Sequence, residues 1–116
     1  MIAADFSSAQ LFAADFEGAR LQGALLATSY LQAANFRSSK MQGVDATGAS
    51  LQGAFFERAY LQAATFYAAK IQGASFKNAT LPHASMRCAL SFRNNFDNSD
   101  RQQAVVTKEP CEISTG

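Results

Sequence analysis

The stretch AYLQAATFYAAKIQGASF, residues 59–76, places its large apolar residues at intervals of five: Leu61, Phe66, Ile71 and Phe76. On an α-helix, a step of five residues rotates the side chain by about 140° net, so these residues would lie on every side of the helix. On an extended strand, the same step reverses the face each time, and half of the large residues would meet water. The spacing therefore excludes both an amphipathic helix and a regular strand.

The period of five extends far beyond this stretch. Seventeen consecutive rows of five residues run from Ala4 to Cys88 without an insertion. The first position of a row is Ala, Ser or Val, and the third is a large apolar residue in every row except the one with Ala46. In that row Val44 takes the first position, and its larger side chain makes up part of the core volume that Ala46 leaves unfilled. Six of the seven glycines occupy the fifth position, where a turn needs a permissive backbone.

These rows predict a chain wound into a coil. Each row is expected to be a short extended piece whose first and third residues point inward, followed by a corner at the fourth and fifth positions. Four rows per coil bring like residues together, because one column then contains only phenylalanine: Phe16, Phe36, Phe56, Phe76 and Phe96. Three rows per coil would mix phenylalanine, leucine and alanine. We therefore predict four rows per coil and about four coils, stacked at about 4.8 Å.

Rows such as ADFEG, ARLQG and ANFRS resemble the pentapeptide-repeat family, and this resemblance covers residues 4–88. It implies an all-β fold, a right-handed quadrilateral β-helix with four pentapeptides per coil. The handedness comes from the resemblance and not from the spacing. Because members of the family differ widely in function, the resemblance implies a fold and no activity.

Two regions are predicted, a β-helix over residues 1–98 and a cap with a flexible tail over residues 99–116. Ser99 is followed by Gln102, the spacing of a helix N-cap, so a short capping helix is expected near residues 100–107.

The sequence offers no cap at its N-terminal end, since Met1 already falls at an inward position of the repeat. Two expectations follow from this. One is an end-to-end homodimer through the uncapped coil, and the other is that the chain is a segment of a larger effector or membrane-tethered solenoid.

Residues for catalysis or metal binding are sparse. His83 is the only histidine and follows a proline at a corner, so it is interpreted as an exposed turn residue. Cys88 and Cys111 form no CxxC pair and are predicted to be free thiols, as in a reducing compartment. The chain has no signal peptide and no apolar run of roughly 18–20 residues, so a cytoplasmic location is expected. We predict no enzyme activity, no cofactor, no metal and no small-molecule substrate.

Glutamine recurs at the fourth position and forms two ladders at the period of the coil: Gln22, Gln42 and Gln62, and Gln32, Gln52 and Gln72. We expect the stacked amides to hydrogen-bond along each ladder. This structural interpretation is preferred to a recognition surface.

Charge gives little support for nucleic-acid binding. The net charge is +1, and the rows from 4 to 88 carry five acidic and seven basic residues. Binding to nucleic acid needs a concentrated basic surface, so no direct contact is expected. Some members of the family that this chain resembles imitate duplex DNA, bind DNA gyrase and give quinolone protection. Such mimicry needs regular negative charge, and it is kept as an alternative function.

The outward residues that differ most from a merely solvated face are Phe55, Arg58, Tyr60 and Tyr67. Exposed aromatic side chains beside an arginine are typical of protein interfaces, so these four are the candidate protein-binding surface. The other interpretation is lateral packing between neighbours in the coil. Four further outward apolar residues are Phe12, Leu25, Tyr30 and Phe92. The predicted function is a non-catalytic protein–protein interaction scaffold with an unidentified protein partner.

Overall fold

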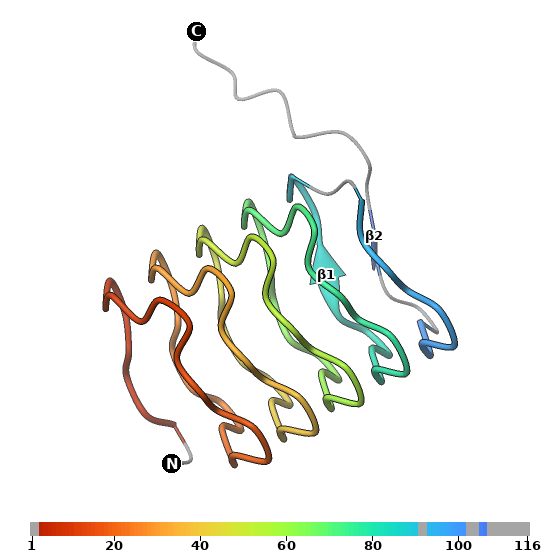
Figure 1. Ribbon diagram of the computed structural model, residues 1–116, viewed down its shortest axis with the longest axis horizontal. Coiled ribbons are helices and arrows are strands. Elements are labelled where there is room, and N and C mark those ends of the chain that lie inside the picture. Colours follow the sequence, from red (N-terminus) through yellow and green to blue (C-terminus); the bar gives the residue numbers. More distant parts are fainter. Residues whose placement is uncertain (1–2, 91–92, 102–104, 107–116) are drawn as a thin grey trace, which may run out of the picture.

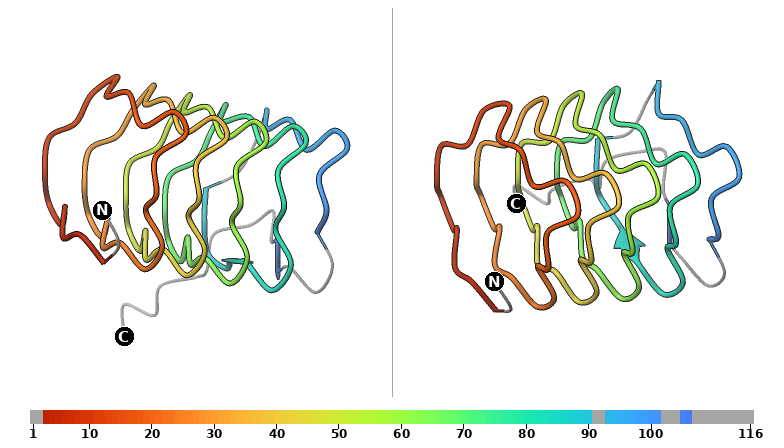
Figure 2. Two further views of the ribbon diagram at one scale, coloured as in Figure 1. Left: turned by 90° about the horizontal axis from the view of Figure 1, so that it is seen from below. Right: turned by 60° about the horizontal axis from the view of Figure 1, so that its bottom comes forward.

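The computed structural model describes residues 3–90, 93–101 and 105–106. The chain winds as a rising coil in which successive turns lie side by side (Figure 1). Two short strands are long enough to be named, β1 (Ser85–Met86) and β2 (Val105–Val106), and they pair in parallel. The rest of the coil is held by isolated parallel bridges, and two further views show the successive turns stacked along one axis (Figure 2).

The bridges define four faces, because each second-position residue pairs with the residue twenty positions later. We name each face after its first residue. The Asp5 face contains Asp5, Leu25, Asp45, Thr65, Ser85 and Val105. The Gln10 face contains Gln10, Tyr30, Ser50, Lys70 and Leu90. The Asp15 face contains Asp15, Asn35, Phe55, Ser75 and Asn95. The Arg20 face contains Arg20, Lys40, Tyr60, Thr80 and Asp100. The prediction of four rows per coil is confirmed.

Each corner is a tight turn with a left-handed residue at the fifth position of the row. The Ala9 N–H donates to the Phe6 carbonyl at 3.0 Å and closes such a turn. Of the two central residues of this turn, Ser7 and Ser8, only Ser8 has positive φ, as in a type II turn. A positive φ at the fifth position of the row recurs at every described corner from Ala3 to Asn98. Glycine adopts this conformation without steric cost, which explains its preference for the fifth position. Thr28 is β-branched and still adopts this left-handed conformation, with φ of 56°.

The inside of the coil is filled by the first and third positions of the rows. Rings of the phenylalanine column stack at centroid distances of 5.2, 5.0, 4.8 and 5.1 Å, with planes within 6° of parallel. Val44 and Ala46 are both buried. This agrees with the prediction that, in their row, the larger side chain at the first position makes up for the smaller one at the third. Ser29 and Ser39 take the place of alanine and donate their hydroxyls to the Leu26 and Phe36 carbonyls, so no inward hydroxyl lacks a partner there.

The C-terminal capping helix was predicted wrongly where the structure describes that region. Asp100 forms a parallel bridge with Thr80, and β2 continues the ladder of the Asp5 face. From Asp5 to Val105 that ladder spans five coils, one more than predicted. The physical reason is that the last coil presents unpaired backbone groups, and an extended segment satisfies them in register. Residues 105–106 of the predicted helix are thus strand, and the predicted flexible tail lies outside the described residues.

The free-thiol prediction is wrong for Cys88. This residue is disulfide-bonded, and the described residues contain no free cysteine. Cys111 lies outside the described residues. Sequence separation carries no information on whether two cysteines approach to within the roughly 4.4–6.8 Å that a disulfide spans, which is why the spacing argument failed. In the part of the chain that the structure describes, no helix has the length and apolar character to cross a membrane.

Candidate functional site

The four candidate residues lie on one coil but on three successive faces. Phe55 belongs to the Asp15 face, Tyr60 to the Arg20 face, and Tyr67 follows the bridge residue Thr65 of the Asp5 face. Arg58 stands at the corner between the first two faces, with φ of 61°. Tyr60 is 42% exposed and Tyr67 is 45% exposed, whereas Phe55 is half-buried. The residues therefore wrap around the coil and do not form one flat patch.

Phe55 is engaged by its own neighbours in the coil. The guanidinium carbon of Arg37 lies 4.3 Å from the centroid of the Phe55 ring. The same guanidinium contacts Glu57, with Nε 3.2 Å from Oε1. Glu57 Oε1 has no aligned hydrogen-bond donor, so this contact is a charge pair and not a hydrogen bond. Lateral packing within the coil, the alternative interpretation, thus describes Phe55 better than Tyr60 or Tyr67.

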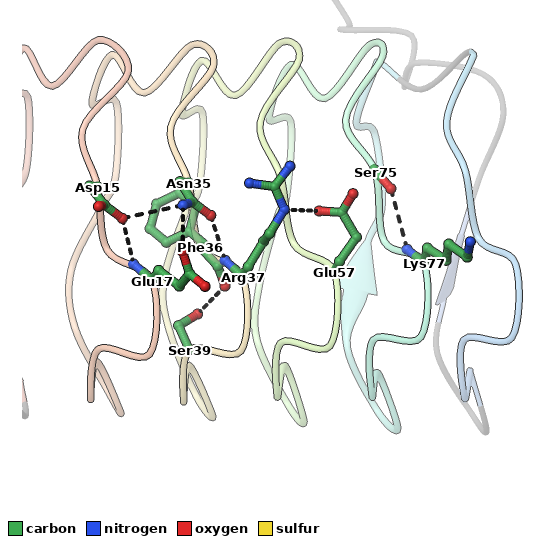
Figure 3. A network of polar contacts seen from close by, with 9 residues as sticks. All are labelled: Asp15, Glu17, Asn35, Phe36, Arg37, Ser39, Glu57, Ser75 and Lys77. Carbon is green, nitrogen blue, oxygen red and sulfur yellow. Dashed lines mark hydrogen bonds and ion pairs between the residues drawn. The ribbon is translucent and has the colours of Figure 1, made fainter.

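The Asp15 face carries a series of polar contacts from coil to coil (Figure 3). Asn35 Nδ2 donates to Asp15 Oδ1 at 3.3 Å and to Glu17 Oε1 at 3.2 Å. The fourth positions of this face alternate in charge from coil to coil: Glu17, Arg37, Glu57, Lys77 and Asp97. Opposite charges on neighbouring strands attract, so the sign pattern stabilises the stack. Among these charges, Arg37 and Glu57 form an ion pair.

Acidic and amide residues at the second position have a local role that sequence reasoning missed. Their Oδ1 accepts the N–H two residues later and holds the chain as it enters the corner, at Asp5, Asp15, Asn35, Asp45 and Asn95. Asx turns of this kind explain why Asp and Asn recur after the alanine. Hydrogen bonds from Ser7, first from its backbone and then from its side chain, lower the pKa of Asp5 below the ordinary value of 3.8.

The Arg20 face differs from the Asp15 face in its charge pattern. Arg20 and Lys40 are direct bridge partners, and both side chains are exposed. Neither takes part in an ion pair with any of the described residues. Tyr60 follows Lys40 in the same ladder, and Arg58 lies at its edge. The period of twenty already places Arg20 beside Lys40, so this like-charge pair could have been found from the sequence.

Both glutamine ladders lack the predicted amide hydrogen bonds. The Oε1 atoms of all six residues are buried and accept no hydrogen bond: Gln22, Gln32, Gln42, Gln52, Gln62 and Gln72. An amide ladder needs each Nε2–H to point along the stack at the next Oε1. At the fourth position the side chain leaves the backbone from a turn and not from a strand, so the strand-like geometry assumed for the ladder does not apply.

The described residues do not assemble a metal centre, since no group of three His, Cys, Asp or Glu side chains among them is placed to hold an ion. His83 is exposed at a corner with φ of 62°, as expected for a turn residue. The described part of the molecule is a filled coil with chemically distinct outer faces.

The family model for pentapeptide repeats matches this sequence in eight copies, over residues 2–27, 29–66, 39–78 and 59–89. No curated protein matches the sequence closely enough to count as a relative. Among solved structures, a pentapeptide repeat protein of the Arabidopsis thaliana thylakoid lumen is 28% identical with a TM-score of 0.72. That match covers 74% of this chain and 60% of the Arabidopsis chain, so this chain spans less than two thirds of its length.

Two further structures have the same fold. Rfr23 from the cyanobacterium Cyanothece 51142 is 18% identical with a TM-score of 0.63, covering 92% of this chain and 86% of that chain. QnrB1, a plasmid-mediated fluoroquinolone resistance protein, is 16% identical with a TM-score of 0.59, covering 89% of this chain and 56% of that chain. At these identities the likeness shows the fold alone.

Proposed function

This chain belongs to the pentapeptide-repeat family, and from that premise we propose that it is a non-catalytic scaffold that binds another protein through its outer faces. The family is generally non-catalytic. The interior is occupied by the chain's own side chains, from Leu21 to Ala89, which leaves the outer faces for recognition. A rigid coil with fixed side-chain spacing loses little conformational entropy when it binds, and this favours a binding role.

The observation that carries the proposal is the pair of exposed tyrosines on one coil, Tyr60 and Tyr67, with Arg58 beside Tyr60. Neither ring belongs to the core, and tyrosine and arginine are among the residues that most often anchor protein interfaces. Phe55 lies at the same edge and is held there by its contact with Arg37.

An affinity pull-down from the source cells tests the scaffold function. The wild-type chain is compared with the double variant Phe55→Ala and Tyr60→Ala, and the captured proteins are identified by mass spectrometry. We expect the double variant to lose a specific partner while its circular dichroism spectrum stays that of the wild type. Capture that is unchanged by the double variant would remove this surface from the proposal.

A matched control exists on the Gln10 face, where Phe12 is 65% exposed and Tyr30 is 45% exposed. The double variant Phe12→Ala and Tyr30→Ala removes two exposed aromatic side chains from a different side of the coil, whereas the test variant removes the exposed Tyr60 and the half-buried Phe55. It should keep the partner. Loss of capture with both double variants would indicate a general effect of hydrophobic surface and not a site.

The likeness to QnrB1 does not extend to a proposal of gyrase binding. Regular negative charge would be needed, and the acids of the coil are spread over the Asp5, Asp15 and Arg20 faces. On the Asp15 face they alternate with Arg37 and Lys77. A supercoiling assay with DNA gyrase is expected to show no effect of the protein.

For the location, two observations support an oxidising compartment over the cytoplasm. Cys88 is disulfide-bonded, and structural disulfides persist mainly in oxidising compartments. One similar structure is that of a thylakoid-lumen protein. Alkylation of whole cells with a maleimide before lysis tests this: Cys88 should be protected until a reductant is added. Labelling without reductant would instead support a reducing compartment.

A further inference from the structure

We propose that the Arg20 face docks an acidic segment of the partner protein, using Arg20, Lys40, Tyr60 and the corner residue Arg58. The proposal rests on the scaffold function above and adds to it the chemistry of the partner. It is carried by the charge pattern of this face and by the contrast with the other faces of the same coil.

The Arg20 face contains a local electrostatic conflict. Arg20 and Lys40 are direct partners in a parallel bridge, and neighbouring coils stack at about 4.8 Å. Like charges placed directly opposite each other on adjacent strands repel and destabilise the pair. Both side chains are exposed, and no acid among the described residues forms an ion pair with either. The free chain therefore holds two cations side by side without compensation.

The same fold resolves such a conflict on another face. Along the Asp15 face, Glu17, Arg37 and Glu57 alternate in sign from one coil to the next. The two charges of the Arg37–Glu57 contact lie 3.2 Å apart. Alternating positive and negative side chains along one face is thus compatible with the coil. Departures from such local consistency are expected at functional sites.

No acidic residue occupies the Arg20 ladder from Arg20 to Tyr60. Asp100 is the only acidic residue of the Arg20 ladder, and it lies three coils beyond Lys40. The remaining acids of the ladders, Asp5, Asp45 and Asp15, lie on other faces. The part of the Arg20 face from Arg20 to Tyr60, with Arg58 at its edge, is thus a basic strip next to an exposed aromatic ring.

Carboxylates of a protein segment fit this strip better than nucleic acid does. Two adjacent cations with a third at the corner match a short acidic run, and Tyr60 offers an anchor for an apolar side chain within that run. Nucleic-acid binding draws on many phosphate contacts and on a concentrated basic surface, while this chain has a net charge of +1.

The test uses fluorescence anisotropy with two probes of similar charge, fluorescein-labelled deca-glutamate and fluorescein-labelled deca-thymidylate. We expect the wild-type chain to bind deca-glutamate and the double variant Arg20→Gln and Lys40→Gln to bind it at least about tenfold more weakly. The control double variant, Lys70→Gln and Lys77→Gln, removes the same charge from the Gln10 and Asp15 faces. It should bind like the wild type.

Three results would overturn the proposal. One is equal loss of affinity in the control variant, which would mean general electrostatic attraction. Another is deca-thymidylate binding as tight as that of deca-glutamate, which would indicate a nucleic-acid surface. The third comes from Lys40→Glu, which places opposite charges in the bridge with Arg20. This variant should unfold at higher urea than the wild type and lose binding, whereas lower stability would remove the argument from repulsion.

The pull-down separates this proposal from the scaffold function. Both the scaffold function and the acidic docking are supported if the wild type captures a partner and each of two double variants loses it. One variant changes Phe55 and Tyr60, and the other changes Arg20 and Lys40. If the partner is indifferent to the loss of Arg20 and Lys40, the scaffold function stands and the acidic docking is wrong. If the wild type captures no protein at all, the scaffold function fails first.

Discussion

The fifth residue of each row carries most of the conformational constraint in this chain. Its φ is positive at every described corner, including fourteen residues that are not glycine. An L-residue in this conformation brings its Cβ close to the following carbonyl oxygen, at a cost of about 1–2 kcal/mol. The coil maintains these conformations because each corner is bonded to the next: the Ser8 N–H, for example, donates to the Ala27 carbonyl.

Ala63→Gly should therefore stabilise the protein. Ala63 has φ of 60°, and glycine removes a strain of about 1–2 kcal/mol, while the more flexible unfolded chain offsets about 0.4–1 kcal/mol of this gain. We expect a net increase of about 1 kcal/mol in the free energy of unfolding, measured by urea denaturation. The control is Ala64→Gly, which removes a buried methyl next door and should destabilise. Destabilisation by Ala63→Gly would contradict the account of the corners.

A pH dependence is expected from Asp5. Its pKa in the folded state is lowered by the hydrogen bonds from Ser7, so the contribution of the carboxylate to stability is present above the ordinary value of 3.8. This contribution to stability is lost as the pH falls from 3.8 through the lower pKa of the folded state. Asp5→Asn keeps the acceptor oxygen and removes the titration. The difference in unfolding free energy between wild type and variant should shrink as the pH is lowered below 3.8, and a constant difference would contradict the proposed cause.

At the level of the element, one row of five is the structural unit, and it has no stability by itself. Each row donates backbone hydrogen bonds to its neighbouring coils, as in the Phe6 N–H to Leu25 carbonyl and Leu25 N–H to Ala4 carbonyl pair. Inward side chains pack mainly against the rows of the coils above and below. Stability therefore grows by stacking, as in other solenoids.

Phe56→Ala should be strongly destabilising. The Phe56 ring is fully buried, stacks at 5.0 Å on Phe36 and at 4.8 Å on Phe76, and meets Phe66 edge-on. Removing a buried phenylalanine costs about 3–5 kcal/mol, because a cavity remains in a closely packed core. Urea denaturation measures this loss. On the same coil Tyr60→Ala should change stability by about 0.5 kcal/mol or less, and equal effects of the two variants would contradict the inward and outward assignment.

For the whole molecule, the coil presents four faces whose chemistry differs although their backbone is the same. One face stacks alternating charges, another places two cations together, and each can evolve separately because outward side chains have no role in the core. Function in such a fold is therefore distributed over residues that are twenty positions apart in sequence.

The end-to-end homodimer remains a prediction at this scale. In the first described coil, the N–H groups of Gln10, Asp15 and Arg20 donate no backbone hydrogen bond within the described residues. An open parallel edge of this kind pairs readily with another chain. Sedimentation velocity of the 116-residue chain should show concentration-dependent dimers, and Gln10→Pro, which removes a donor from that edge, should reduce them. A dimer that persists in Gln10→Pro would assign the contact to another surface.

Much of the fold was predictable from the sequence because each row repeats the same local information. The period of five indicates where the chain turns, and the period of twenty identifies the stacked partners, so the phenylalanine column and the Val44–Ala46 exchange follow from residue spacing and size alone. The candidate site was predictable only in part. Tyr60 and Tyr67 were expected outward and are exposed, but the cover of Arg37 over Phe55 depends on a side-chain conformation that no period specifies.

By itself, then, the sequence determined the coil, its core columns and its corners, since these depend on residue size and backbone freedom that recur in every row. Only the tertiary structure decided that residues 105–106 pair with β1 as a strand, that Cys88 is in a disulfide, and that the glutamine Oε1 atoms lack donors. Those features depend on how groups far apart in the chain meet in space, and outside the regular repeat the spacing of residues along the sequence does not encode such distances.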